Sequence, residues 1–216
     1  MTRESTYSVK EIYRTLQGEG AMTGRAAVFL RFTGCNLWTG READRPNAVC
    51  QFCDTDFIGT DGPRGGKYTA TQLVEEVTAC WLDGLEHDRQ RYVVCTGGEP
   101  GLQLDAKLID ALHAAHFEIA IETNGTVPLP DGIDWICVSP KANAELVTRQ
   151  GHELKLVYPQ ELAHPSRFEA LAFEHFFLQP KDDAAQQENI QATIAYCQTH
   201  PQWRLSLQTH KLIGIP

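Results

Sequence analysis

The sequence predicts a parallel α/β fold, because short apolar runs alternate with amphipathic helical patterns along the chain. The apolar runs are mostly unbroken, as in parallel strands that are covered on both faces. A complete eightfold β/α barrel usually needs about 250 residues, so a chain of 216 residues favours a shortened, open barrel with a mainly parallel sheet of about six strands. We expect these strands at 26–32, 91–97, 117–123, 134–140, 152–158 and 175–180, with a weaker seventh at 203–210.

The helices are expected between these strands. Apolar residues at 73, 74, 77, 81 and 82 form one stripe along 69–82, and similar spacing recurs in 105–116 and 184–200. The glycine-rich segment 58–68 is expected to be a long surface loop. Since no internal repeat or linker interrupts this pattern, we expect residues 1–216 to form a single domain.

Composition excludes several classes of protein. The net charge is −9, from 19 basic and 28 acidic residues, and no run of Lys and Arg offers a face for nucleic acid. No apolar run approaches the roughly 20 residues needed to cross a bilayer, and the polar start "MTRESTYSVK" lacks a secretory signal. We therefore expect a cytoplasmic protein that acts on a small molecule, with its seven cysteines reduced.

Polar motifs follow the predicted strands, at the point where each strand ends. A cysteine-containing loop, 34–55, follows the first strand, and "TGGEP" (96–100) follows the second. The segments "ETNG" (122–125), "SPK" (139–141) and "QPKDD" (179–183) follow later strands. Because functional residues of such folds lie at the carboxyl ends of the strands, these motifs are expected to converge on one rim.

Three cysteines of the 34–55 loop, Cys35, Cys50 and Cys53, form a C-x14-C-x2-C pattern. Structural zinc normally has four protein ligands, and no histidine precedes residue 87. A [4Fe–4S] cluster that is held by only three thiolates keeps one iron free to chelate another molecule. The remaining cysteines lie in predicted helices and strands, where cysteine usually behaves as a small buried hydrophobic residue; they are Cys80, Cys95, Cys137 and Cys197.

The pattern Cys50-x-Phe52-Cys53 resembles the last half of the radical S-adenosylmethionine signature, C-x3-C-x-(aromatic)-C. The chain departs from that signature in the fourteen residues between its first two cysteines, where the family has three. A longer loop can still bring the thiols together, since its closure entropy grows slowly with length. Gly97-Gly98-Glu99 resembles the superfamily's Gly-Gly-Glu motif, in which glycines let the backbone approach the ligand and the carboxylate pairs with the methionine ammonium.

Further stretches are similar to the 7-carboxy-7-deazaguanine synthase family; they are Leu16–Gly20, Arg31–Leu37, Cys53–Thr55 and Ser139–Lys141. The resemblance covers nearly the whole chain. It implies conversion of 6-carboxy-5,6,7,8-tetrahydropterin into 7-carboxy-7-deazaguanine with loss of ammonia, in queuosine (7-deazapurine) biosynthesis. It also implies a [4Fe–4S] cluster, S-adenosylmethionine, Mg2+, a reducing electron-donor protein and a homodimer.

The resemblance implies a role for individual residues of this sequence. Cys35, Cys50 and Cys53 would hold the cluster, and Thr55 would offer a hydroxyl to Mg2+. The residues expected to contact S-adenosylmethionine are Phe52, Gly98, Glu99, Ser139, Pro140, Lys141 and Gln179. Those expected to bind the pterin are Leu16, Gln17, Gly18, Arg31, Thr96 and Pro216, with the Arg31 guanidinium suited to a planar carboxylate.

Several assignments stay open at this stage. Glu122 and Asn124 are candidates for ligand contacts or for turn stabilisation, and the tail 210–216 either folds over the site or simply packs. Residues 36–49 form a short helix or an irregular loop. Two other functions remain alternatives: an enzyme that installs a glycyl radical on a partner protein, and a zinc-stapled binding module.

Overall fold

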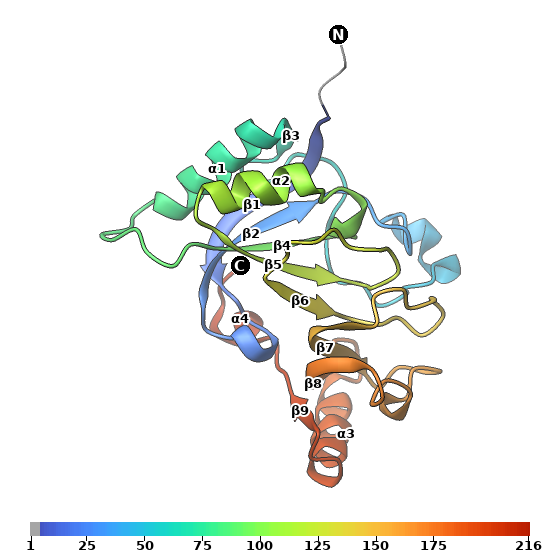
Figure 1. The fold of residues 1–216 in the computed structure, drawn as a ribbon. Helices are drawn as coiled ribbons and strands as arrows, with labels where there is room; N and C mark the ends of the chain where they lie inside the picture. Colours follow the sequence, from blue (N-terminus) through green and yellow to red (C-terminus); the bar gives the residue numbers. More distant parts are fainter. Residues whose placement is uncertain (1–4) are drawn as a thin grey trace.

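The computed structural model describes residues 5–216, and a nine-stranded sheet runs through them (Figure 1). Its strands, in spatial order, are β3 (Gly66–Tyr68), β1 (Tyr7–Leu16), β2 (Ala26–Phe32), β4 (Tyr92–Gly97), β5 (Glu118–Thr123), β6 (Trp135–Val138), β7 (Gln150–Tyr158), β8 (Ala172–Pro180) and β9 (Trp203–Leu205). Strand β1 is antiparallel to both of its neighbours, whereas the strands from β2 to β9 are parallel. The expected open, mainly parallel α/β sheet is confirmed.

The expectation of about six strands is wrong, because two strands lie where none was expected. Strand β1 mixes charged and apolar residues, with Tyr7 and Ile12 buried while Glu11 and Tyr13 line a cavity. This half-polar pattern does not resemble the apolar runs of the other strands. Strand β3 uses only the last three residues of the expected 58–68 loop. At the other end, the expected 203–210 strand stops at Leu205, and its last residues begin helix α4 (Thr209–Ile213).

The three expected helices are present within one or two residues of their predicted starts. Helices α1 (Ala70–Leu82) and α2 (Ala106–Ala114) cover one face of the sheet, and α3 (Gln186–Thr199) lies beside β8 and β9 (Figure 1). Thr69 and Gln72 form a capping box at the start of α1. Asp105 caps α2 by accepting a hydrogen bond from the backbone N–H of Leu108 at 3.0 Å.

Alternation along the strands divides the side chains between two faces of the sheet. On the face covered by α1 and α2, Val93 and Ile121 belong to the main hydrophobic core with Leu73 and Leu108 of the helices. On the opposite, concave face, the neighbouring positions carry polar side chains toward the strands' carboxyl ends. Arg31, Thr96, Glu122 and Lys155 line a cavity there. The pleat of the sheet therefore separates the core from the candidate site.

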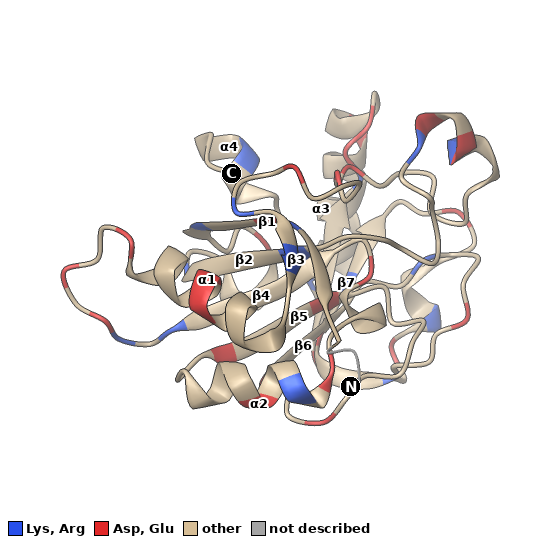
Figure 2. Cartoon of the chain, turned by 90° about the horizontal axis from the view of Figure 1, so that it is seen from above, with Lys and Arg blue, Asp and Glu red and all other residues tan. Residues whose placement is uncertain are grey.

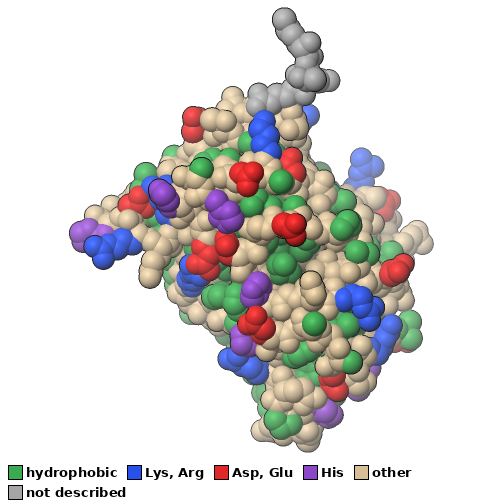
Figure 3. Space-filling view, viewed as in Figure 1, with side chains coloured by type: hydrophobic (Ala, Val, Ile, Leu, Met, Phe, Trp, Pro, Cys, Tyr) green, Lys and Arg blue, Asp and Glu red, His purple; other side chains and the backbone are tan. Residues whose placement is uncertain are grey.

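Charged residues of both signs are interspersed along the ribbon in Figure 2, and the face seen in Figure 3 shows the same mixture over its surface. Within residues 5–216, no helix combines the length and the apolar character needed to span a membrane.

Candidate active site

A cavity of about 410 Å³ lies at the carboxyl ends of the parallel strands. Segments far apart in the sequence line it, including the β1–β2 connection, the 34–55 loop and the C-terminal tail. The lining contains all the residues to which the sequence assigned a site role except Glu99 and Pro140. It also contains the two weaker candidates, Glu122 and Asn124.

The three loop thiols are free and all line this cavity, with Cys50 buried and Cys35 and Cys53 half-buried. Residues 42–47 of their loop form a short 3-10 helix, so the 36–49 segment is partly helical. Among residues 5–216, no three His, Cys, Asp or Glu side chains surround one metal-ion position. A cubane cluster makes a different demand, since each thiolate binds its own iron. Three free thiols that open into one cavity fit that donor set.

The two neighbouring thiols, Cys50 and Cys53, shift each other's pKa. Cys50 lowers the pKa of Cys53 to about 6, and Cys53 together with burial raises the pKa of Cys50. Burial raises the pKa of Cys35. The ammonium of Lys141 also favours the thiolate form at both Cys50 and Cys53. Cys53 is therefore the more acidic thiol of the pair.

The lowered pKa of Cys53 predicts an order of thiol reactivity in metal-free protein. At pH 7, Cys53 should be alkylated by iodoacetamide before Cys35 and Cys50, because the thiolate is the reacting form. The rate should rise with pH through about 6 and then level off. Peptide mapping by mass spectrometry after short exposures would measure it. Faster labelling of Cys50 than of Cys53 would contradict this order of acidity.

The glycines after β4 allow the 96–100 turn to pack against the start of the cysteine loop. Gly97 has a φ of +132°, and an added Cβ there would lie 2.2 Å from the carbonyl oxygen of Phe32. An added Cβ at Gly98 would lie 2.1 Å from the carbonyl oxygen of Gly34. The backbone N–H of Glu99 donates to that same Gly34 oxygen at 2.9 Å. Glycine is therefore required where the 96–100 turn packs against the start of the cysteine loop.

Glu99 is fully buried, and its carboxylate serves the turn rather than the cavity lining. Its Oε1 accepts hydrogen bonds from the Thr123 hydroxyl at 2.7 Å and the Gly101 N–H at 2.9 Å, and its Oε2 accepts from the Asn124 N–H at 2.8 Å. Burial raises the pKa of Glu99, although these three donors act in the opposite direction. Glu99 thus ties the end of β5 to the turn that follows β4.

Two cations stand beside Phe52, the aromatic residue of the cysteine motif. The ammonium nitrogens of Lys141 and Lys181 each lie 5.9 Å from the centre of its ring. Lys141 also donates to the backbone oxygen of Ser139 at 2.7 Å and to its hydroxyl at 2.8 Å. These bonds fix Ser139 and Lys141 at the cavity wall, while Pro140 between them is outside the lining.

Arg31 is already engaged by two neighbours on β1. Its Nε donates to Glu11 at 2.7 Å, and one terminal nitrogen donates to the Tyr13 hydroxyl at 2.9 Å. A guanidinium has five N–H donors, so further N–H groups remain for a ligand in the cavity. Glu11 and Tyr13 were not predicted from the sequence as partners that orient this side chain.

A buried ionic network lies beneath the cavity, and sequence analysis missed most of it. Lys155 Nζ lies 2.7 Å from Glu19 Oε2 and 2.8 Å from Glu122 Oε2. Burial alone would lower the pKa of Lys155, but surrounding acidic groups raise it well above its usual value. Burial would raise the pKa of Glu19, yet Lys155 lowers it. The available signal was the pair Glu153 and Lys155, two charged residues that alternate with the buried Leu154 and Leu156.

The C-terminal tail closes one side of the cavity. The backbone N–H and hydroxyl of Thr209 both donate to the oxygen of Gly18, at 2.9 and 2.8 Å. Lys211 forms ion pairs with Asp54 at 2.7 Å and with Asp182 at 2.6 Å. The Thr15 hydroxyl donates to the oxygen of Pro216 at 2.8 Å. Of the two alternatives left open, the tail folding over the site is the one observed.

No protein-family model matches the chain. Curated relatives do match: it is 64% identical to 7-carboxy-7-deazaguanine synthase of Bordetella pertussis, over 97% of this chain and 99% of that protein. It is 58% identical to 7-carboxy-7-deazaguanine synthase of Burkholderia multivorans, over 98% of this chain and the whole of that protein. The crystal structure of QueE from Escherichia coli superimposes with a TM-score of 0.70 at 26% identity, covering 95% of each chain.

The fold, the motifs at its carboxyl edge and these similarities place the chain in the radical S-adenosylmethionine class of enzymes. A sequence identity of 64% over 97% of the chain also identifies the family. The chain belongs to the 7-carboxy-7-deazaguanine synthase family.

Proposed function

We propose that this chain converts 6-carboxy-5,6,7,8-tetrahydropterin into 7-carboxy-7-deazaguanine with loss of ammonia. Its similarity to 7-carboxy-7-deazaguanine synthases over nearly the whole length carries the proposal. The cavity supports it, because about 410 Å³ is within the range of small-molecule sites. Neither the glycyl-radical alternative nor the zinc-stapled alternative is favoured by these relatives.

The donor set of the cavity supports a cluster held by Cys35, Cys50 and Cys53. When bound, a [4Fe–4S] cluster and S-adenosylmethionine would supply the electron and the organic radical that start the reaction. The chain's own task is then to hold the reactants close together in the correct orientation. We propose that Phe52, Gly98, Glu99, Gln179 and the Ser139–Lys141 turn hold S-adenosylmethionine. Glu99 would do so from its buried position behind the lining.

The substrate end of the cavity is proposed to lie toward β1, β2 and the tail. The carboxylate of the pterin would accept hydrogen bonds from the free N–H groups of Arg31, which Glu11 and Tyr13 hold in place. Leu16, Gln17, Gly18, Thr96 and Pro216 surround the same space. Glu122, at the floor, would contact the pterin ring.

Thr55 is proposed to bind Mg2+ through its hydroxyl, with the substrate and waters supplying further oxygen ligands. Thr55→Ala should therefore blunt the Mg2+ dependence of turnover, raising the Mg2+ concentration for half-maximal rate by about tenfold, the low end of the cost of perturbing a metal site. Thr55→Ser, which keeps the hydroxyl, should retain most of the dependence. Titration of initial rates with Mg2+ measures this, and an unaltered curve for the alanine variant would remove Thr55 from the metal site.

The reaction itself is tested with anaerobically reconstituted protein, a chemical reductant, S-adenosylmethionine and the pterin substrate. We expect 7-carboxy-7-deazaguanine and ammonia in equal amounts, detected by mass spectrometry and an ammonia assay, without any partner polypeptide. Absence of product from protein that still cleaves S-adenosylmethionine would contradict the proposed substrate. We further infer a homodimer, a protein electron donor in the cell, and the reducing cytoplasm as the place of action.

A further inference from the structure

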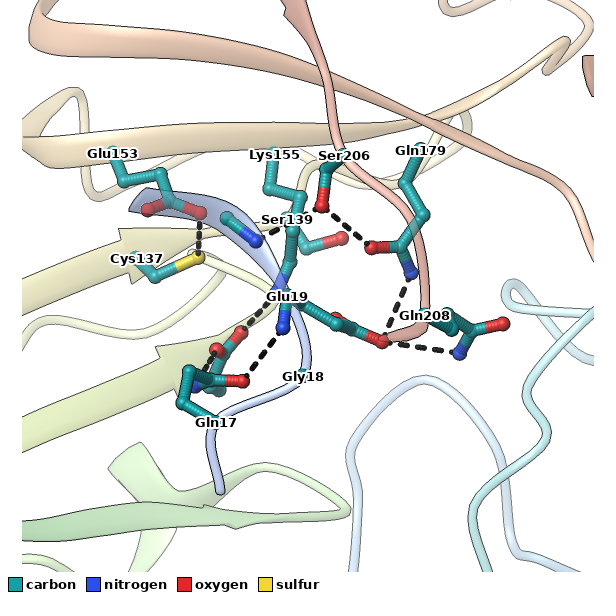
Figure 4. Close-up of polar contacts among 12 residues, drawn as sticks. Gln17, Gly18, Glu19, Cys137, Ser139, Glu153, Lys155, Gln179, Ser206 and Gln208 are labelled. Atoms are coloured by element: carbon teal, nitrogen blue, oxygen red, sulfur yellow. Dashed lines mark hydrogen bonds and ion pairs between the residues drawn. The ribbon is translucent and has the colours of Figure 1, made fainter. Parts of the chain in front are cut away.

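Lys155 occupies the floor of the cavity, on the concave face of β7, and is 3% exposed. Its ammonium lies between two carboxylates from distant parts of the chain, Glu19 after β1 and Glu122 on β5. Figure 4 shows Lys155 beside Glu19, whose other oxygen accepts hydrogen bonds from Gln179 at 3.1 Å and Gln208 at 3.0 Å. The network thus connects the strand floor to the tail that covers the cavity.

The two carboxylates are more accessible than the lysine between them. Their side chains are 18% and 20% exposed for Glu19 and Glu122, against 4% for Lys155. The lysine is therefore enclosed, while part of each glutamate side chain faces the cavity. An ionised carboxylate has about four acceptor positions. Glu122 accepts hydrogen bonds from the Gln17 amide at 3.2 Å and from the Lys155 ammonium at 2.8 Å, so acceptor capacity is left over for a ligand.

Stability alone gives little reason for a lysine at this position. A buried ion pair often contributes no more than a well-packed apolar group, because removing the charges from water offsets their attraction. Without the ammonium, however, two adjacent carboxylates would favour sharing a proton. The protonated carboxyl group would then donate a hydrogen bond, and the cavity floor would no longer offer only acceptors to a ligand.

We propose that Lys155 is a positioning residue for substrate recognition, which holds Glu19 and Glu122 as an ionised pair of acceptors. The complementary ligand edge carries adjacent N–H donors, as the 2-aminopyrimidinone edge of a pterin does. This inference rests on the proposed function, since it takes the pterin as the occupant of the cavity. Lys155 acts through the two carboxylates and does not itself touch the substrate.

The test compares the affinities of two ligands on the same reconstituted protein under anaerobic conditions. Lys155→Met should weaken binding of 6-carboxy-5,6,7,8-tetrahydropterin by about 10- to 100-fold, the factor for one lost charge-assisted hydrogen bond. Its affinity for S-adenosylmethionine should change by less than about threefold, because the pair reaches that ligand only indirectly, through Gln179. Arg25→Met is the matched control, since it breaks the Arg25–Glu118 ion pair outside the cavity lining; pterin affinity should not change.

A double-mutant cycle with Glu122→Gln distinguishes an effect of Lys155 through Glu122 from a general effect of Lys155 on the fold. If Lys155 acts through Glu122, the double variant should bind the pterin no more weakly than the worse single variant. Fully additive losses, an unchanged affinity in Lys155→Met, or equal losses for both ligands would overturn the proposal. Lys155→Gln, which keeps a donor at the site, should show the same selective loss in milder form and serves if the methionine variant does not fold. Wild-type protein that does not bind the pterin would instead overturn the proposed function, and the role of Lys155 with it.

Discussion

Cys53→Ala should abolish product formation, because it removes one of the three thiolates proposed to hold the cluster. Substitutions that only perturb the surroundings of a metal site already cost about 10- to 100-fold, so loss of a ligand should lower turnover by more than about 100-fold. The iron and sulfide content of the reconstituted variant should fall together with activity. Colorimetric iron and sulfide analysis, run beside the turnover assay, measures both.

Cys197→Ala is the matched control for this experiment. Cys197 is a half-buried free thiol on α3 and does not line the cavity. Its variant should keep normal iron content and activity after reconstitution. If Cys53→Ala retained a full complement of iron and sulfide, the assignment of the cluster to these three thiols would be contradicted.

Glu99→Gln should combine a loss of stability with a loss of affinity for S-adenosylmethionine. The buried carboxylate accepts hydrogen bonds from Thr123, Asn124 and Gly101, and an amide at this position must turn an NH2 group toward at least one donor. One unsatisfied buried polar group costs about 1–3 kcal/mol, which denaturant unfolding would detect. We expect S-adenosylmethionine affinity to fall by about tenfold, because the variant loses the negative charge that lies behind the cavity lining.

Thr123→Val separates the two effects of Glu99. It removes the hydroxyl that donates to Glu99 at 2.7 Å and leaves the carboxylate in place. The same hydroxyl accepts a hydrogen bond from the Gly125 N–H at 3.0 Å. Stability should therefore fall by about 1–3 kcal/mol, since two buried hydrogen bonds are lost, with little change in S-adenosylmethionine affinity. Equal affinity losses in the two variants would indicate that Glu99 only supports the turn and does not recognise the ligand's charge.

The buried strands could be predicted from the sequence because short, unbroken apolar runs are typical of parallel strands that are covered on both faces. Strand β2, Ala26–Phe32, begins and ends as expected. Strand β1 could not be recognised in the same way, since one of its faces borders the cavity and carries Glu11 and Tyr13. Pairing with β1 is also what makes a strand of the short segment Gly66–Tyr68. Its three residues have too little pattern to predict a strand by themselves.

Placement of the candidate site residues could be predicted because parallel strands end at a common edge, so motifs after different strands must meet there. The side-chain orientation of Glu99 could not, because whether a carboxylate faces the cavity or the protein depends on donors that the fold brings from β5. The Lys155 network was missed for the same reason. Its partners Glu19 and Glu122 are separated from it by long stretches of sequence and meet it only in the folded chain.

The most direct test of the proposed site is the electron paramagnetic resonance spectrum of the reduced, reconstituted protein before and after addition of S-adenosylmethionine. A cluster held by Cys35, Cys50 and Cys53 alone has one iron open to an external ligand. We predict a reduced-cluster signal whose g values shift when S-adenosylmethionine binds, and no such shift in Cys53→Ala. A colourless protein that holds stoichiometric zinc, or a cluster signal that S-adenosylmethionine leaves unchanged, would contradict the open-iron site.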